Sequence, residues 1–181
     1  MSQKVVFLDR DGVINRGFDD GYVDRLEKLS FVPRSLGALR WLREAGYKVI
    51  VISNQAGVGK GIYSMKTLRE VTRQIRQTVR EKGGRLNAIY YCPHPAEERC
   101  SCRKPKTGLF RKAKRRFGIR LREAVFVGDS RVDIEAGKAI GCRTVLVLSG
   151  RNRRRPRWEM RPDAVCKDLW DAVTWILKKD R

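Results

Sequence analysis

The sequence predicts an α/β protein with a central parallel sheet and helices on both faces. Short apolar runs rich in β-branched residues alternate, from one end of the chain to the other, with longer segments of helical periodicity. The first run, Val5-Val6-Phe7-Leu8, is apolar without interruption, which is typical of a strand buried on both faces. Because strands that alternate with helices pair in parallel, these observations predict one parallel sheet covered by helices on each side.

Six strands and five helices are predicted. The strands are apolar runs bounded by polar or glycine residues, and in chain order they cover residues 5–8, 49–52, 88–91, 124–127, 144–148 and 164–165. The helices place their apolar residues on one face, and they cover residues 36–45, 65–79, 109–117, 131–140 and 169–177. Helix-end signals support these bounds: Pro33 precedes the first helix, Ser64 is a typical N-cap of the second, and Gly118 follows the third.

The composition is that of a globular protein with a large excess of positive charge. The 181 residues are 41% hydrophobic, and 41 Lys and Arg oppose 20 Asp and Glu, a formal net charge of +21. No apolar run approaches the roughly 18 residues that a membrane span needs, and the first twenty residues lack the apolar stretch of a signal peptide. We expect a cytoplasmic protein with no membrane partner, folded as one domain over residues 1–181.

Polar side chains follow three of the predicted strands at the point where each ends. Asp9 and Asp11 follow the first strand, Ser53 the second, and Asp129 the fourth. These side chains should meet, because the carboxyl ends of parallel strands lie at one edge of a sheet. Grouped carboxylates repel one another unless a cation lies among them, and oxygen ligands suit Mg²⁺. The alternative is that these residues cap helices, which fits Asp129 but explains Asp9 and Asp11 poorly.

Four motifs resemble, in order and spacing, those of the haloacid dehalogenase (HAD) superfamily of phosphatases. They are Asp9-x-Asp11-Gly12-Val13-Ile14-Asn15, Ser53-Asn54-Gln55, Lys104, and Gly128-Asp129-x3-Asp133. The resemblance extends over the chain to about Gly150. It implies a Rossmann-like HAD fold without a large cap domain, and Mg²⁺-dependent hydrolysis of phosphomonoesters.

The resemblance also implies a role for each matching residue. Asp9 would be the nucleophile that becomes an aspartyl phosphate. Asp11 would protonate the leaving oxygen and then activate water as a base. Mg²⁺ would lie between the carboxylates of Asp9 and Asp129 and the backbone carbonyl of Asp11, while Ser53 and Lys104 would hold the phosphoryl oxygens.

Four potential metal ligands stand within eleven residues after the third strand: Cys92, His94, Cys100 and Cys102. Three thiolates and one imidazole form a closed tetrahedral set for Zn²⁺, so this site is predicted to be structural. The alternatives are reduced cysteines without metal, or a disulfide, which fits poorly in a reducing compartment. Closure of the loop by zinc would fix the following Arg103 and Lys104 near the phosphate.

The Cys-x-His…Cys-x-Cys-Arg-Lys-Pro element resembles that of two small, capless HAD groups. These are the D-glycero-D-manno-heptose-1,7-bisphosphate 7-phosphatases, favoured by Gly21-Tyr22-Val23, and the histidinol-phosphate phosphatases, which Val23-Asp24-Arg25 resembles. The heptose interpretation leads, and it places the protein in carbohydrate metabolism with a sugar bisphosphate as substrate. It implies that the sugar or its second phosphate contacts Asp19, Asp20, Gly21, Tyr22, Asn54, Gln55 and Arg103.

Nucleic acid is the rival partner, because a zinc loop beside basic residues can also bind nucleic acid. A binding module without catalysis and a polynucleotide 3′-phosphatase are the two forms of this alternative. Fifteen Lys and Arg lie in residues 103–122 and 151–157, which contain no acid, but neither stretch interleaves the aromatics of a base-stacking platform. A small phosphorylated substrate bound by a monomer is therefore favoured, and the role of residues 151–157 stays open.

Overall fold

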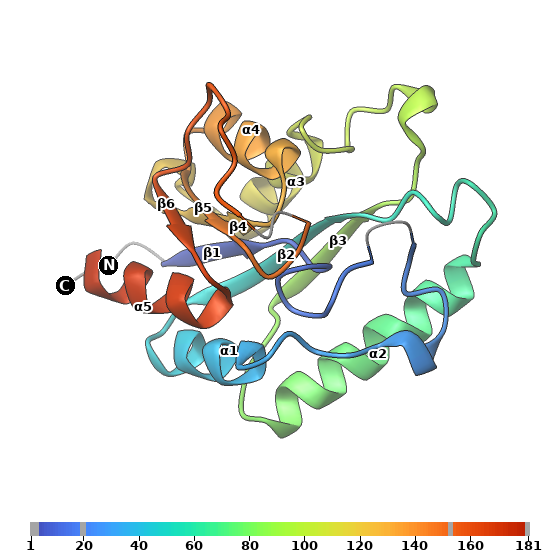
Figure 1. The fold of residues 1–181 in the computed structure, drawn as a ribbon, viewed down its shortest axis with the longest axis horizontal. Coiled ribbons are helices and arrows are strands. Elements are labelled where there is room, and N and C mark those ends of the chain that lie inside the picture. The colour runs from blue at the N-terminus through green and yellow to red at the C-terminus, as the bar shows by residue number, and fades with distance from the viewer. Residues whose placement is uncertain (1–3, 19–20, 152–153, 180–181) are drawn as a thin grey trace.

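The computed structural model describes residues 4–18, 21–151 and 154–179 and confirms the predicted parallel sheet (Figure 1). Six strands, all paired in parallel, lie in the order β3-β2-β1-β4-β5-β6. They are β1 (Val5–Leu8), β2 (Lys48–Asn54), β3 (Ala88–Cys92), β4 (Val125–Gly128), β5 (Arg143–Val147) and β6 (Ala164–Cys166).

The predicted helices are also present, with ends shifted by one to two residues. They are α1 (Ser35–Glu44), α2 (Met65–Glu81), α3 (Gly108–Phe117), α4 (Arg131–Ala139) and α5 (Leu169–Lys179). Ser64 is the N-cap of α2, since its side chain accepts a hydrogen bond from the Thr67 N–H at 3.0 Å. Gly118 ends α3 with φ of 63°, in the left-handed region that favours glycine. No helix among the described residues is long and apolar enough to cross a membrane.

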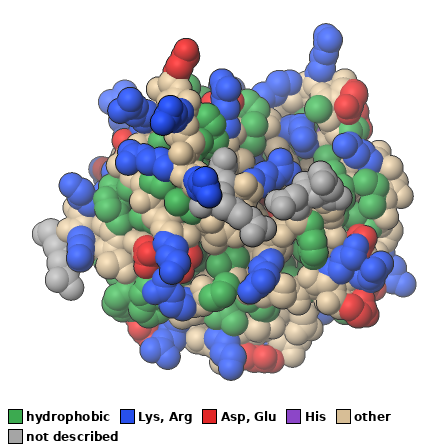
Figure 2. All heavy atoms as spheres, viewed as in Figure 1, with side chains coloured by type: hydrophobic (Ala, Val, Ile, Leu, Met, Phe, Trp, Pro, Cys, Tyr) green, Lys and Arg blue, Asp and Glu red, His purple; other side chains and the backbone are tan. Residues whose placement is uncertain are grey.

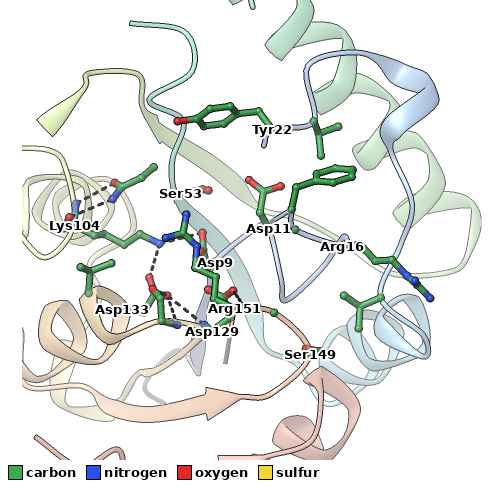
Figure 3. A pocket seen from close by; sticks show the side chains of 18 of the residues that line it. Asp9, Asp11, Arg16, Tyr22, Ser53, Lys104, Asp129, Asp133, Ser149 and Arg151 are labelled. Atoms are coloured by element: carbon green, nitrogen blue, oxygen red, sulfur yellow. Dashed lines mark hydrogen bonds and ion pairs between the residues drawn. The ribbon is translucent and has the colours of Figure 1, made fainter. Parts of the chain in front are cut away.

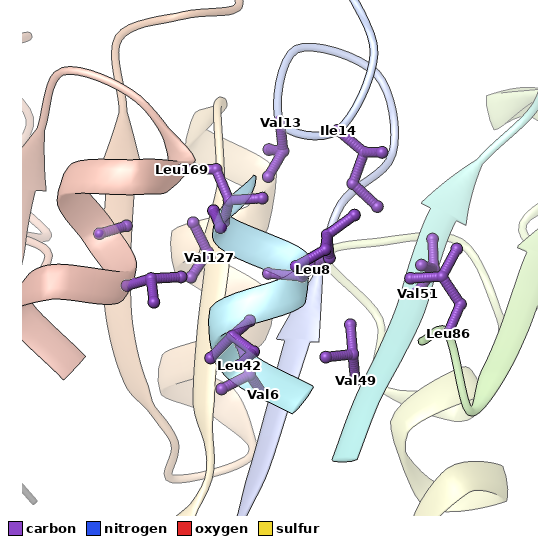
Figure 4. Packing of buried hydrophobic residues seen from close by; sticks show 14 of the residues in the cluster. Val6, Leu8, Val13, Ile14, Leu42, Val49, Val51, Leu86, Val127 and Leu169 are labelled. Atoms are coloured by element: carbon purple, nitrogen blue, oxygen red, sulfur yellow. The ribbon is translucent and has the colours of Figure 1, made fainter. Parts of the chain in front are cut away.

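The helices cover both faces of the sheet and create a core on each. Val6 and Leu8 of β1 pack on one side with α1, α2 and α5 (Figure 4), while Phe7 packs on the other with α3 and α4. On that second side the ring of Phe110 meets Phe7 at 5.1 Å and Phe126 at 5.0 Å between centroids. Successive side chains of β1 thus enter different cores, which explains its uninterrupted apolar sequence.

The strand order places the functional edge in the middle of the sheet. The chain builds β2 and β3 on one side of β1, and then crosses over to build β4, β5 and β6 on its other side. In such sheets ligands bind where the order reverses, at the carboxyl ends of the strands. In this protein the reversal lies between β1 and β4, which end immediately before Asp9 and Asp129. The described residues contain no inserted cap domain over this edge.

Candidate active site

A pocket of about 1090 Å³ opens at the carboxyl ends of β1, β2 and β4 (Figure 3). The pocket brings together the side chains that the strand-end argument selected. Among its lining residues are Asp9, Asp11, Ser53, Lys104, Asp129 and Asp133, together with Gly21, Tyr22, Asn54 and Arg103 from the expected substrate contacts. Asp19 and Asp20 lie outside the described residues, so contacts from them stay a prediction.

Asp9 is held at the bottom of the pocket, immediately after β1. The backbone N–H of Arg10 donates to its Oδ1 at 2.7 Å, and the ammonium of Lys104 lies 3.0 Å from the same oxygen. Both contacts fall on Oδ1, which leaves Oδ2 as the oxygen suited to attack a substrate. Burial raises the pKa of Asp9 to about 6, against the opposing effect of the Lys104 charge.

Lys104 lies buried between two carboxylates. Its Nζ is 2.6 Å from Asp133 and 3.0 Å from Asp9, and it donates to the Ile52 carbonyl at 2.9 Å. Burial lowers the pKa of Lys104, but the charges of Asp133 and Asp9 outweigh it, and the net pKa lies above its ordinary value. The lysine is therefore a permanent cation in the position predicted for binding a phosphoryl oxygen.

Asn54 makes two hydrogen bonds that the sequence did not predict. Its Oδ1 accepts from the backbone N–H of Lys104 at 3.0 Å, and its Nδ2 donates to the Lys104 carbonyl at 3.2 Å. Both polar atoms of the amide are thus engaged by one residue. Asn54 therefore positions Lys104, and since it also borders the pocket, its contact with substrate stays a prediction.

Asp133 sets the local geometry around Asp129. Its Oδ2 accepts from the N–H groups of Asp129 and Ser130 and from the Ser130 hydroxyl, at 3.2, 3.1 and 2.5 Å. Ser130 and Asp133 therefore cap α4, which removes helix capping as an explanation for Asp129. Gly128 is required beside them, because a Cβ there would lie 2.3 Å from the Asp133 Cβ. The motif contained Asp133, but its ion pair with Lys104 was not foreseen.

The donor set fits a hard divalent cation. Carboxylate oxygens of Asp9, Asp129 and Asp133 lie within 4.8 Å of one another. Asp133 is occupied by Lys104 and the helix cap, so Asp9 and Asp129 are the better ligands. Burial raises the pKa of Asp129 to about 8, with the neighbouring charges of Asp133 and Asp9 adding to the rise. Ionising two neighbouring buried carboxyls is unfavourable, and a bound Mg²⁺ would offset this with its positive charge.

The raised pKa values give a pH dependence that can be measured. Both carboxyls have pKa values above the ordinary 3.8, so the metal-free folded protein holds protons that the unfolded chain releases. Proton binding by these two carboxyls stabilises the folded state. Its contribution to the free energy of unfolding is fully present below pH 3.8 and is lost as the pH rises through about 6 for Asp9 and about 8 for Asp129. The free energy of unfolding of the metal-free protein should therefore fall from pH 5 to pH 8, while the stabilisation added by Mg²⁺ should grow. Urea unfolding at both pH values measures each quantity.

Asp129→Asn supplies the control for this pH dependence, because the amide cannot titrate. The variant should show a shallower fall in stability between pH 5 and pH 8 and a smaller gain from Mg²⁺. Equal stability of the metal-free wild type at the two pH values would contradict the assignment of these carboxyls.

Asp11 is held by side chains that lie behind the pocket. Arg10 donates to Oδ1 through Nε at 3.0 Å and to both oxygens through Nη2 at 2.9 and 3.0 Å. Asn15 donates to Oδ1 and Gln55 to Oδ2, each at 2.7 Å. Gln55 is fully buried and does not line the pocket, so it positions Asp11, and its predicted contact with substrate stays a prediction. Arg10, only 1% exposed, was not selected from the sequence.

The mouth of the pocket is basic. Five cationic side chains border it: Arg16, Arg34, Arg103, Arg151 and Lys167. Of these, Arg34 is paired with Asp168, a further lining residue, at 2.6 Å. Arg151 begins the unexplained arginine stretch, and its N–H donates to Asp129 Oδ2 at 2.8 Å while its side chain points toward Asp9 (Figure 3). On the face seen in Figure 2, Lys and Arg are spread among other side chains and do not form one stripe. This distribution fits a small anionic ligand better than a polynucleotide.

The four predicted zinc ligands converge at the end of β3. Cys102 Sγ lies 3.1 Å from both Cys92 Sγ and His94 Nδ1, and Cys100 Sγ lies 3.5 Å from Cys92 Sγ. Because a disulfide needs sulfurs about 2.05 Å apart, the disulfide alternative is wrong for this cluster, whose thiols are free. The four ligand atoms lie within 4.8 Å of one another, which fits tetrahedral zinc. Cys166 lies elsewhere.

Comparison with known proteins agrees with this geometry. A family model described as HAD-hydrolase-like matches residues 101–172. The D-glycero-beta-D-manno-heptose-1,7-bisphosphate 7-phosphatase of Pseudomonas aeruginosa is 41% identical over 85% of this chain and 86% of its own length. The D-glycero-alpha-D-manno-heptose-1,7-bisphosphate 7-phosphatase of Photorhabdus laumondii is 35% identical over 84% of this chain and 87% of its own length. Among solved structures, the D,D-heptose 1,7-bisphosphate phosphatase from B. bronchiseptica, complexed with magnesium and phosphate, superposes with a TM-score of 0.90. It is 32% identical in sequence, and the match covers 98% of this chain and 99% of that chain.

Proposed function

The chain belongs to the HAD-like phosphatases, and from that premise we propose that it removes the 7-phosphate of D-glycero-D-manno-heptose 1,7-bisphosphate. The observation that carries the proposal is the division of the pocket into a buried acidic end and a basic mouth. A substrate with two phosphates would place one at each. The names of the relatives supply the identity of the sugar.

The reaction would proceed in two steps at the acidic end. Oδ2 of Asp9 attacks phosphorus, the bond from phosphorus to the sugar oxygen breaks, and Asp11 donates a proton to that oxygen. Asp11 then takes a proton from water, which attacks phosphorus and releases phosphate and free Asp9. Lys104 holds a phosphoryl oxygen throughout, and Ser53, buried at the end of β2, is placed to donate to another.

Asp9 and Asp129 would hold Mg²⁺, together with the predicted carbonyl of Asp11. When bound, the ion supplies positive charge that offsets the repulsion between the carboxylate and the phosphate. The repulsion between one pair of unit charges 4 Å apart is about 4 kcal/mol near a protein surface. The buried ammonium of Lys104, 3.0 Å from Asp9, lowers this repulsion further.

The distal part of the substrate would lie along the pocket mouth. Gly21 and Tyr22 border the pocket from the loop after β1, where they can contact the sugar. Arg103 borders it from the zinc loop, and Arg151 from the loop after β5. We assign the second phosphate to this basic mouth, whose positive field would also speed the capture of a doubly charged ligand.

Zinc would serve as the anchor of the catalytic lysine. Cys102 is two residues before Lys104, and the Arg103 guanidinium donates to the His94 carbonyl at 3.3 Å. A closed set of three thiolates and one imidazole leaves no open position for chemistry. The metal would therefore act through the geometry of Arg103 and Lys104.

Cys102→Ser is expected to lose the bound zinc and to unfold at lower temperature. The free energy of unfolding should fall by about 3 kcal/mol or more, because the free energy of zinc binding contributes to the stability of the folded loop. This corresponds to a Tm drop on the order of 10 °C. Elemental analysis and thermal melting measure these two consequences, and turnover at saturating Mg²⁺, which should fall, measures the effect on Lys104. Cys166→Ser, outside the cluster, should keep zinc, Tm and activity. A zinc-free Cys102→Ser protein that melts and turns over like wild type would refute the role.

One substrate panel tests the proposed function. With Mg²⁺ present, kcat/KM is compared for both anomers of the heptose bisphosphate, for histidinol phosphate and for a 3′-phosphorylated oligonucleotide. We expect the heptose bisphosphate to be preferred and activity to vanish without Mg²⁺. A preference for histidinol phosphate would move the chain to that group. A preference for the oligonucleotide, with rates that fall steeply as salt rises, would establish the polynucleotide phosphatase instead.

A further inference from the structure

A chain of buried hydrogen bonds leads away from the pocket behind Asp11. The Tyr63 hydroxyl, just before α2, donates to Gln55 Oε1 at 2.6 Å. Gln55 Nε2 then donates to Asp11 Oδ2 at 2.7 Å and to Ser53 Oγ at 3.0 Å. One amide thus touches two residues to which the proposed reaction gives a role, and one hydroxyl fixes that amide.

We propose that Tyr63 is a positioning residue for the proton transfer by Asp11, acting through the orientation of the Gln55 amide. The inference rests on the proposed function, since it assumes that Asp11 protonates the leaving oxygen. Tyr63 itself does not border the pocket and touches no reacting atom.

The Tyr63 hydroxyl holds the carbonyl end of the Gln55 amide. The Asp11 carboxylate can only accept, so it takes the amide nitrogen, and the hydroxyl keeps the opposite end of the amide in line with that contact. Without the hydroxyl, Oε1 would lose this donor and the amide would be held at its nitrogen alone. Gln55 is fully buried and Tyr63 is 6% exposed, so bulk water has little access to restore the lost bond. Burial also raises the pKa of Tyr63, which keeps the hydroxyl protonated as a donor.

The Gln55 amide supplies the shorter of the two hydrogen bonds to Oδ2 of Asp11. Oδ1 accepts hydrogen bonds from Arg10 and Asn15. Oδ2 accepts one from Gln55 at 2.7 Å and a longer one from Arg10 at 3.0 Å. Loss of the Gln55 contact would leave Oδ2 with only the longer bond from Arg10, so the carboxylate would be held less firmly at that oxygen. Proton transfer requires an oxygen within hydrogen-bond reach of the leaving group, so this weaker hold would slow it.

The packing of Tyr63 connects this chain to the wall of the pocket. Its ring lies 5.7 Å from the ring of Tyr22, which borders the pocket. Gly57 makes room for the ring, because a Cβ there would lie 2.2 Å from Tyr63 Cε1. The side chain is therefore confined by its neighbours, and removal of the hydroxyl alone should leave the ring in place.

Tyr63→Phe tests the inference through two substrates with different leaving groups. For the heptose bisphosphate, whose alkoxide must be protonated as it leaves, kcat/KM is expected to fall about tenfold. For p-nitrophenyl phosphate, whose phenolate leaves without a proton, it should stay within about twofold of wild type. General disturbance of Asp9, Ser53 or Lys104 would lower both values equally. Tyr90→Phe is the matched control: that hydroxyl is buried without a partner among the described residues, so neither value should change.

A double-mutant cycle keeps the test decisive. Gln55→Leu should lower kcat/KM for the heptose bisphosphate more than Tyr63→Phe does, and adding Tyr63→Phe to Gln55→Leu should change nothing further. Equal losses for both substrates, no loss for either, or additive effects of the two substitutions would overturn the inference. If the wild type hydrolyses neither substrate with Mg²⁺, the proposed function fails instead, so the two failures are distinct.

Discussion

An Asp9→Asn variant is expected to lose essentially all phosphatase activity while it remains folded. The amide has nearly the shape of the carboxylate but no anionic oxygen to attack phosphorus, and loss of a nucleophile costs at least about 10⁴-fold in kcat. Burial raises the pKa of Asp9 to about 6, so above that pH the ionised carboxylate destabilises the folded protein, and removing the charge should increase the free energy of unfolding. We therefore expect the free energy of unfolding of the metal-free variant at pH 8 to equal or exceed that of wild type.

Steady-state turnover and urea unfolding measure these two effects. Asp24→Asn is the matched control, because Asp24 follows β1 in the same loop but pairs with Lys28 and does not line the pocket. Its activity should be that of wild type. Appreciable turnover by Asp9→Asn would remove Asp9 from the nucleophile's role.

A Lys104→Met variant is expected to lose both activity and stability. In the wild type the buried Lys104 ammonium lies 3.0 Å from Asp9 and 2.6 Å from Asp133. Methionine at this position would leave both buried carboxylates without this counter-charge. Removal of one partner of a buried ion pair costs about 3–5 kcal/mol. The free energy of unfolding should fall by this amount, and Mg²⁺ should restore part of it by supplying positive charge to Asp9.

Urea unfolding with and without Mg²⁺ measures the loss and its partial recovery. Lys82→Met, at the exposed end of α2, removes the same charge and should change neither stability nor activity. A Lys104→Met protein as stable as wild type would show that the lysine does not neutralise the acidic end of the pocket.

The fold could be predicted almost completely because local signals and tertiary packing agree. The uninterrupted run in β1 is matched by a core on each face, and Ser64 caps α2 as its residue type suggests. The differences are shifted element ends and three short 3-10 helices in the connections, Leu26–Lys28, Ala96–Glu98 and Leu121–Glu123, which were not predicted. The strand predicted at 49–52 continues to Asn54, because Ser53 and Asn54 still pair with β3 although their side chains are polar.

The candidate site could be predicted only where residue type and strand end coincide. Asp9, Asp11 and Asp129 follow strands and converge as the topology requires. Arg10 could not be recognised, since an arginine between two aspartates looks like a surface ion pair until the fold buries it. The positioning contact of Tyr63 joins residues that neither periodicity nor strand-end placement relates. Such contacts depend on side-chain packing, which the pattern of residue types does not encode.

The central claim is an aspartyl-phosphate mechanism at Asp9 on a heptose bisphosphate, and trapping the intermediate tests it most directly. The wild-type protein is mixed with Mg²⁺ and the substrate, quenched rapidly in acid, and its peptides are analysed by mass spectrometry. We predict a phosphoryl group on Asp9 that is absent from Asp9→Asn. Product formation in the same samples with phosphate on another residue, or with no phosphorylated peptide at any quench time, would contradict the account.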